Sequence, residues 1–145
     1  MKKTFVILFL SVATFTTTFA IAEPGIDPRI LSAFQKEFSF AQNVKWQERD
    51  GLFQVNFSLS DQGFVAWYNS NAELVSTARN ILYMQLPLTV IKALQQRYAD
   101  ADISGIIEFT SDGETWYQLN ADTKEKKYLL RATPYGQITA TKRLK

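Results

Sequence analysis

The side chains that could carry chemistry in this 145-residue chain are carboxylates, lysines, arginines and hydroxyls, because the sequence contains no histidine and no cysteine. Without histidine the chain lacks the usual general base near neutral pH and any histidine-based triad. Without cysteine it lacks thiol nucleophiles, thiolate metal ligands and disulfides. We therefore predict that the protein is not an enzyme and binds no cofactor.

Two sets of carboxylates are the alternatives to that prediction. Asp100-x-Asp102 has the ligand type for a hard cation, but its flanks lack the twelve-residue calcium-loop pattern. Paired carboxylates could also cleave glycosides, and four acidic residues flank two predicted hairpin turns: Glu48, Asp50, Asp112 and Glu114. These positions favour ordinary solvated turns, and no metal site is predicted. The basic run Lys124, Lys126 and Lys127 is interpreted as an exposed loop tip.

A third set combines large aromatic and basic residues with amides. If the strands proposed below keep their register, one polar sheet face carries Trp67, Trp116, Arg79, Arg131, Arg143, Gln54 and Gln118, together with Asn56, Thr77 and Thr141. Exposed Trp and Arg are typical of protein-binding hot spots. The alternative is that each Trp packs over the sheet edge. We expect Trp116 to lie largely exposed and to contribute to binding, although a one-residue slip would bury it.

Helices and strands alternate along the chain in a pattern that repeats after about 60 residues. Helices are predicted to begin near Asp27-Pro28 and near Pro87, where Asp suits the N-cap and Pro the first turn. Strands are predicted over 43–48, 53–59, 64–69 and 73–81, and over 103–109, 115–121, 127–133 and 137–144. Asp50-Gly51 and Asp112-Gly113 are typical hairpin turns.

The resulting prediction is an α+β fold in which two tandem helix-plus-four-strand repeats, about 28–81 and 87–144, form one antiparallel sheet with the helices on one face. Alternation within the strands and helical spacing within the helices predict one core layer between them. Its expected members are Phe34, Phe38, Val55, Phe57, Leu94 and Tyr98.

Several short motifs resemble a known family. They are Val44-x-Trp46, Asp50-Gly51-x-Phe53-x-Val55-x-Phe57, Ala66-x-Tyr68, Leu86-Pro87 and Tyr98. The pattern resembles the PepSY-like, β-lactamase-inhibitor-like exported proteins of Bacteroidetes-type bacteria, over nearly the whole chain after residue 22. The resemblance implies one sheet with a concave face, and a role in binding or inhibiting other proteins. This chain departs from it at Asn71-Ala72, where relatives often carry Asp-Gly.

The N-terminus has the parts of a secretory signal. Lys2 and Lys3 precede a short apolar run, and the segment ends in Ala20-Ile21-Ala22. The run is too short for a membrane span and is interrupted by threonines. We expect cleavage after Ala22, a single domain over 23–145, and a periplasmic or secreted location.

Cleavage also sets the charge of the mature chain. The loss of Lys2 and Lys3 from the 16 basic residues leaves as many basic as the 14 acidic residues. A neutral chain offers no electrostatic case for nucleic acid. The leading hypothesis is a non-enzymatic binding module for an unknown protein or cell-envelope ligand, with peptidase or β-lactamase inhibition as a special case. The alternative is a structural or stress-related cell-envelope protein without a discrete ligand site.

Overall fold

The computed structural model describes the backbone of residues 25–144 and the side chains of residues 25–139. In chain order the elements are α1 (Pro28–Glu37), β1 (Gln42–Arg49), β2 (Leu52–Leu59), β3 (Gln62–Tyr68), β4 (Leu74–Asn80), the short 3-10 helix η1 (Tyr83–Gln85), α2 (Leu88–Arg97), β5 (Asp102–Ser111), β6 (Glu114–Asp122), β7 (Lys127–Ala132) and β8 (Ile138–Leu144). The expected signal segment lies outside the described residues.

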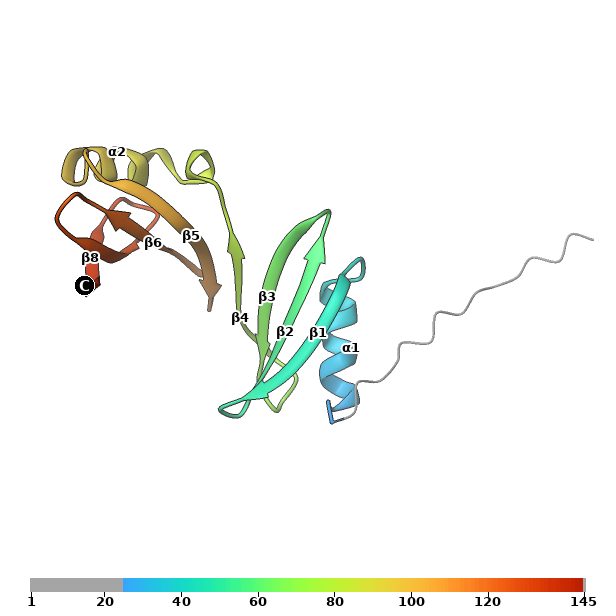
Figure 1. The fold of residues 1–145 in the computed structure, drawn as a ribbon. Helices are drawn as coiled ribbons and strands as arrows, with labels where there is room; N and C mark the ends of the chain where they lie inside the picture. The colour runs from blue at the N-terminus through green and yellow to red at the C-terminus, as the bar shows by residue number, and fades with distance from the viewer. Residues whose placement is uncertain (1–24, 145) are drawn as a thin grey trace, which may run out of the picture.

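The strands form a single antiparallel sheet in the order β1-β2-β3-β4-β5-β6-β7-β8 (Figure 1). The predicted α+β fold of two tandem helix-plus-four-strand repeats is therefore wrong. The ladder is continuous through the pairing of β4 with β5, so the sheet does not divide into two units. Strands hold most of the ordered residues, and the two helices have only ten residues each. The fold is mainly β.

Local sequence signals place the ends of these elements as expected. Asp27 caps α1, because its carboxylate accepts a hydrogen bond from the Arg29 amide at 2.8 Å, and Pro28 follows at the first helical position. Asp50 and Gly51 have φ angles of 53° and 76°, as a tight hairpin turn between β1 and β2 requires. No helix in residues 25–144 is long and apolar enough to cross a membrane.

The β3–β4 turn forms without a glycine at Asn71-Ala72. Ala72 adopts a left-handed φ of 63°. The Asn69 side-chain oxygen accepts hydrogen bonds from the amides of Asn71 and Glu73, at 2.9 and 3.0 Å. These two hydrogen bonds stabilise the turn without the conformational freedom of a glycine, as Asn side chains commonly do in turns.

Both helices cover the same sheet face, but they cover different parts of it. α1 packs over β2 and β3 to form the first core, which consists of Ile30, Phe34, Val55, Phe57, Ala66 and Tyr68. α2 packs over β6 and β7 to form the second core, whose most buried members include Val90, Leu94, Tyr117, Leu119, Leu130 and Ala132. The expected single core layer is thus two clusters. Phe38 and Tyr98 are only partly buried at their margins.

Tyr68 is the one side chain of residues 25–139 with a buried polar atom that lacks a hydrogen-bond partner in the structure. Only 1% of the residue is exposed. Burial raises the pKa of its hydroxyl to about 12, and the negative charge of Glu37 adds to the effect. A buried hydroxyl without a partner costs folding free energy, typically about 1–3 kcal/mol.

We therefore expect Tyr68→Phe to raise the free energy of unfolding by about 1 kcal/mol at pH 7. Because the pKa of Tyr68 is higher in the folded than in the unfolded chain, stability should fall as pH rises from about 10 to about 12, and this fall should be smaller in the variant. Urea denaturation at pH 7 and at a series of alkaline pH values measures both effects. Destabilisation at pH 7 would mean that the hydroxyl is satisfied in solution.

Candidate functional site

The sheet face opposite the helices, called here the open face, carries a row of residues paired across six neighbouring strands. Each member lies directly opposite the next in the ladder. From β1 to β6 the row is Lys45, Asn56, Val65, Ala78, Phe109 and Trp116. Side chains of residues paired in this way point to the same side of the sheet. The row therefore sets aliphatic and aromatic groups side by side on the uncovered face.

Three side chains at one end of this row form a stack. The rings of Phe109 and Trp116 are nearly parallel, with an interplanar angle of 5° and centroids 5.4 Å apart. The Arg131 guanidinium, from β7, lies 4.6 Å from the Trp116 ring centroid. A cation at this distance from an indole is attracted by the ring's quadrupole. The stack holds both Trp116 and the positive charge of Arg131 in fixed places.

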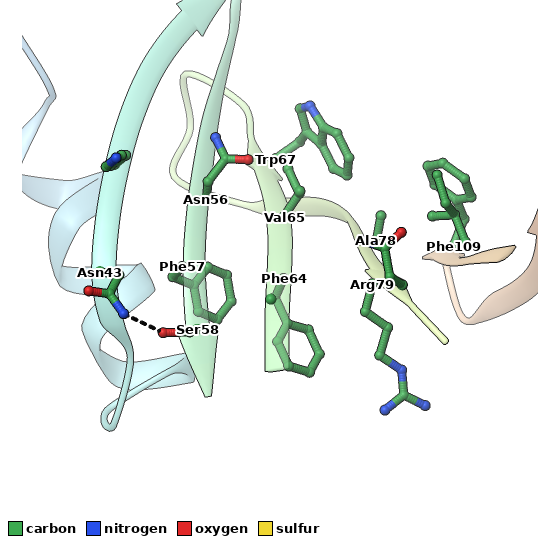
Figure 2. Close-up of a pocket in the computed structure, with 14 residues that line it drawn as sticks. Asn43, Asn56, Phe57, Ser58, Phe64, Val65, Trp67, Ala78, Arg79 and Phe109 are labelled. Atoms are coloured by element: carbon green, nitrogen blue, oxygen red, sulfur yellow. Dashed lines mark hydrogen bonds between the residues drawn. The ribbon is translucent and has the colours of Figure 1, made fainter. Parts of the chain in front are cut away.

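The stack borders a groove of about 530 Å³ that extends from β1 to β5. Phe109 and Trp67 line it on either side of Ala78, as Figure 2 shows. Val65 and Ala78 line it between the two rings, and Lys45 lines it on β1. The groove is therefore mainly apolar, with polar groups along its length, a composition typical of binding sites.

The two amides predicted for this face are on it. Gln54 lies opposite Trp67 in the β2–β3 ladder, and its amide reaches the Asn56 side-chain oxygen at 3.5 Å. Gln118 lies opposite Ile107 and Arg131, beside the stack. Trp67, Trp116, Arg131 and both amides therefore share one face, as predicted.

Trp116 is less exposed than expected. It is partly buried, because Phe109 covers one side of its ring and Arg131 the other. Trp67 is also partly buried, on the opposite side of the groove. Trp67 lines the groove, and Trp116 stacks on Phe109, which also lines it.

Arg79 lines the same groove, but its strand register differs from that of these residues. It is opposite Phe64 and Glu108 in the ladder, which places it on the helix-covered face, and Thr77 shares that face. The Arg79 Nε donates to a Glu108 carboxylate oxygen at 2.6 Å. Burial raises the pKa of the neighbouring Tyr117 hydroxyl, and Glu108 raises it further. Arg79 is therefore a partner of Glu108 between the two cores.

The remaining predicted site residues are in β8. Arg143 lies opposite Tyr128 in the β7–β8 ladder. The side chains of Thr141 and Arg143 lie outside the described residues. The structure therefore does not place their side chains on either face.

The carboxylates considered for chemistry are dispersed and exposed. Asp100 and Asp102 are exposed, as are the four hairpin acids. Within residues 25–144, no three acidic side chains gather in a way that could hold a metal ion. Asp50 and Asp112 lie in hairpin turns, whereas Glu48, Asp102 and Glu114 lie at the ends of strands.

Most residues that line the groove were not among the predicted site residues, and Lys45, Val65, Ala78 and Phe109 are examples. Small and aliphatic residues are typical of a core, so their types gave no signal. Phe109 was placed in a strand, but the alternation of that strand is interrupted. β5 has a bulge between Ser104 and Ile107, which turns Phe109 to the open face.

Comparison with known proteins shows the fold. No protein-family model matches the chain, and no curated protein matches its sequence. Among solved structures, a DUF2874 family protein from Bacteroides uniformis has a TM-score of 0.74 at 15% identity, over 81% of this chain and 89% of that one. A BLIP-like protein from Bacteroides fragilis has a TM-score of 0.71 at 19% identity, over 83% and 89%.

A third structure, from Bacteroides eggerthii and provisionally described as periplasmic, has a TM-score of 0.73 at 15% identity, over 81% of this chain and 88% of that one. At these identities the likeness shows a shared fold. The resemblance to β-lactamase-inhibitor-like proteins is thus confirmed at the level of the fold, and a PepSY-like relationship is not.

Proposed function

We propose that this chain is a non-enzymatic binding module that engages a protein partner through its open face. The observation that carries the proposal is the Phe109–Trp116–Arg131 stack beside an apolar groove, on the face that neither helix covers. Desolvated aromatic and arginine side chains supply most of the affinity in protein interfaces. The fold shared with a BLIP-like protein supports a binding role.

The open face is large enough for such an interface. Eight strands spaced about 4.8 Å apart span about 34 Å, and a seven-residue strand is about 23 Å long. The face therefore covers about 800 Å², which is the area that each partner contributes to a standard interface.

The proposal also covers the cellular location of the protein and the family to which it is related. Export with cleavage after Ala22 places the module in the periplasm or outside the cell, in agreement with the provisional description of the Bacteroides eggerthii protein. The proposal has two more specific parts. One is that the chain is related to PepSY-like proteins, and the other is that it inhibits a peptidase or a β-lactamase.

The test is capture of cell-envelope proteins on the immobilised chain 23–145, followed by affinity measurement with the captured protein. We expect Trp67→Ala and Trp116→Ala each to weaken binding about 30-fold, which corresponds to a hot-spot contribution of about 2 kcal/mol. The control is Leu88→Ser, which changes a 64% exposed residue of α2, and it should bind like the wild type.

Thermal unfolding of each variant confirms that the fold is kept. Binding that survives both tryptophan substitutions would contradict the open face as the site. An empty capture would instead favour the structural cell-envelope alternative.

A further inference from the structure

Four large apolar residues are exposed around the start of α2. Between 64% and 87% of each residue is exposed, and together they are called here the apolar tip: Leu82, Met84, Leu88 and Tyr135. The first three come from the segment that leads from β4 into α2, on the helix side of the sheet (Figure 1). Tyr135 is in the β7–β8 turn, where the neighbouring Pro134 carbonyl accepts a hydrogen bond from the Thr89 hydroxyl of α2. No member of the tip belongs to a strand.

The backbone beneath the tip is held firmly. The Gln85 side-chain oxygen accepts a hydrogen bond from the Leu82 amide at 2.7 Å, and the Gln85 amide donates to the Leu82 carbonyl at 2.9 Å. Leu86, within the same segment, is buried in the second core, and Tyr83 packs against that core. The fold therefore displays these side chains at fixed positions.

The tip is large for an exposed apolar surface. A large side chain presents about 200 Å² when fully exposed, so the four members together expose on the order of 600 Å². The largest apolar patch on a typical monomer covers about 300–600 Å², and patches of this size mark interaction sites. Packing within the chain gives no reason for apolar residues here.

The segments that carry the tip have no negative charge. Residues 74–99 contain no aspartate or glutamate, and the β7–β8 turn has no charged residue. Lys92 lies one helical turn after Leu88 on the same side of α2, is exposed, and has no ion-pair partner among the described side chains. By contrast Phe40, the one other large apolar residue that is more than half exposed in the described chain, follows Glu37 by three positions.

The shape and the residue types of the tip fit a lipid surface. Side chains this exposed have few neighbours, so the tip is convex and offers no pocket to an anchor residue of a protein. A fluid bilayer needs no pocket, because it closes around an inserted side chain. Tyrosine is suited to the level of the headgroups, where one end of its ring is apolar and the other is wet. The positive charge of Lys92 complements anionic headgroups.

We infer that the apolar tip docks the protein onto the surface of an anionic lipid bilayer. Leu82, Met84 and Leu88 insert below the headgroups, Tyr135 lies among them, and Lys92 pairs with their phosphates. The inference does not rest on the proposed function, because no tip residue lines the groove of the open face. Docking through the helix side of the sheet leaves the open face free for a protein partner.

Sedimentation of chain 23–145 with vesicles tests the docking. Vesicles of equal parts phosphatidylglycerol and phosphatidylcholine are compared with vesicles of phosphatidylcholine alone. We expect reversible binding to the mixed vesicles with a constant on the order of 10³ M⁻¹, below the value of about 10⁴ M⁻¹ for one myristoyl chain. Binding to the neutral vesicles should be about fivefold weaker, and Lys92→Gln should remove this difference.

Two matched variants locate the docking surface. Leu82→Ser/Met84→Ser should weaken binding to the mixed vesicles at least fivefold. The control, Phe40→Ser, removes an equally exposed apolar side chain outside the tip and should bind like the wild type. The melting temperature of both variants should stay close to that of the wild type, because the changed residues are exposed.

A fluorescent probe reports insertion directly. Because the chain has no cysteine, Met84→Cys can be labelled at that position alone with a polarity-sensitive fluorophore, and Phe40→Cys is the control. With the mixed vesicles we expect a blue shift, and quenching by nitroxide-labelled lipid, at position 84. We expect neither change at position 40.

Three results would overturn the inference. One is equal vesicle binding by the wild type and Leu82→Ser/Met84→Ser, or no binding at millimolar lipid. Another is a concentration-dependent dimer that this variant abolishes, without vesicle binding, which would show that a second copy covers the tip. The third is loss of a captured protein in the variant while vesicle binding is kept, which would assign the tip to a protein partner.

Discussion

Replacement of Phe57 by alanine should lower the free energy of unfolding by about 3–5 kcal/mol. Phe57 is 3% exposed, and its ring lies at the centre of the first core. The ring centroid is 5.1 Å from that of Phe34 and 4.7 Å from that of Phe38. Phe64 stacks beside it at 5.6 Å. Truncation removes the ring's buried area and its aromatic contacts, and leaves a cavity under α1. Urea denaturation monitored by circular dichroism measures the loss.

Two control variants test whether the loss of stability comes from the burial of Phe57 in the first core. Phe109→Ala removes the same ring from the partly buried open face and should cost less than half as much. Leu119→Ala, in the second core, should also cost about 2–5 kcal/mol. Because the two cores share no buried residue, the double variant Phe57→Ala/Leu119→Ala should be additive within about 0.5 kcal/mol. A Phe57→Ala loss below about 1 kcal/mol would show that the ring faces solvent.

The ends of helices and hairpins could be predicted from the sequence because local chemistry determines them. Asp27 satisfies an amide of its own helix, and Asp50-Gly51 adopts the positive φ angles of its own turn. The fold class could not be predicted in the same way. One antiparallel sheet was expected, but the direct pairing of β4 with β5, which leaves no boundary between two repeats, depends on contacts between residues far apart in the chain.

The faces of the strands were predictable only up to the first bulge. In β4 the register shifts between the Trp67 and Tyr68 pairs, so that Val75 is an extra residue between Leu74 and Ser76. Strict alternation from Leu74 would have placed Arg79 on the open face. The bulge instead exchanges the faces of all later residues of β4, because side chains alternate with a period of two. The error in placing Arg79 follows from this one residue.

The same bulge has a consequence for binding. It turns Ala78 towards the open face in place of Arg79, next to Phe109. Ala78 is buried beside Phe109 at the floor of the groove, and Arg79 pairs with Glu108 on the other face. The tryptophans, by contrast, were identified because β3 and β6 keep simple alternation through Trp67 and Trp116. Regular strands were predictable and bulged strands were not.

The second core depends on a close approach between α2 and the β7–β8 turn. Gly136 in that turn has a φ of 85°, and a Cβ atom there would lie 2.8 Å from the Thr89 carbonyl oxygen. The Thr89 hydroxyl donates to the Pro134 carbonyl, so the two segments are held together at this point. Thr89 adjoins Val90, which is fully buried in the second core. Relief of the contact therefore requires movement of backbone that positions the core.

We expect Gly136→Ala to lower the free energy of unfolding by about 3 kcal/mol, from left-handed strain of about 1–2 kcal/mol together with displacement of α2. Gly113→Ala is the matched control, because its φ is 76° but nothing lies within 4 Å of the added Cβ. It should cost only about 1 kcal/mol. Urea denaturation compares the two, and hydrogen exchange should show loss of protection confined to α2, β7 and β8. Equal costs for both variants would mean that backbone strain alone is responsible and that the approach of Gly136 to Thr89 contributes nothing to stability.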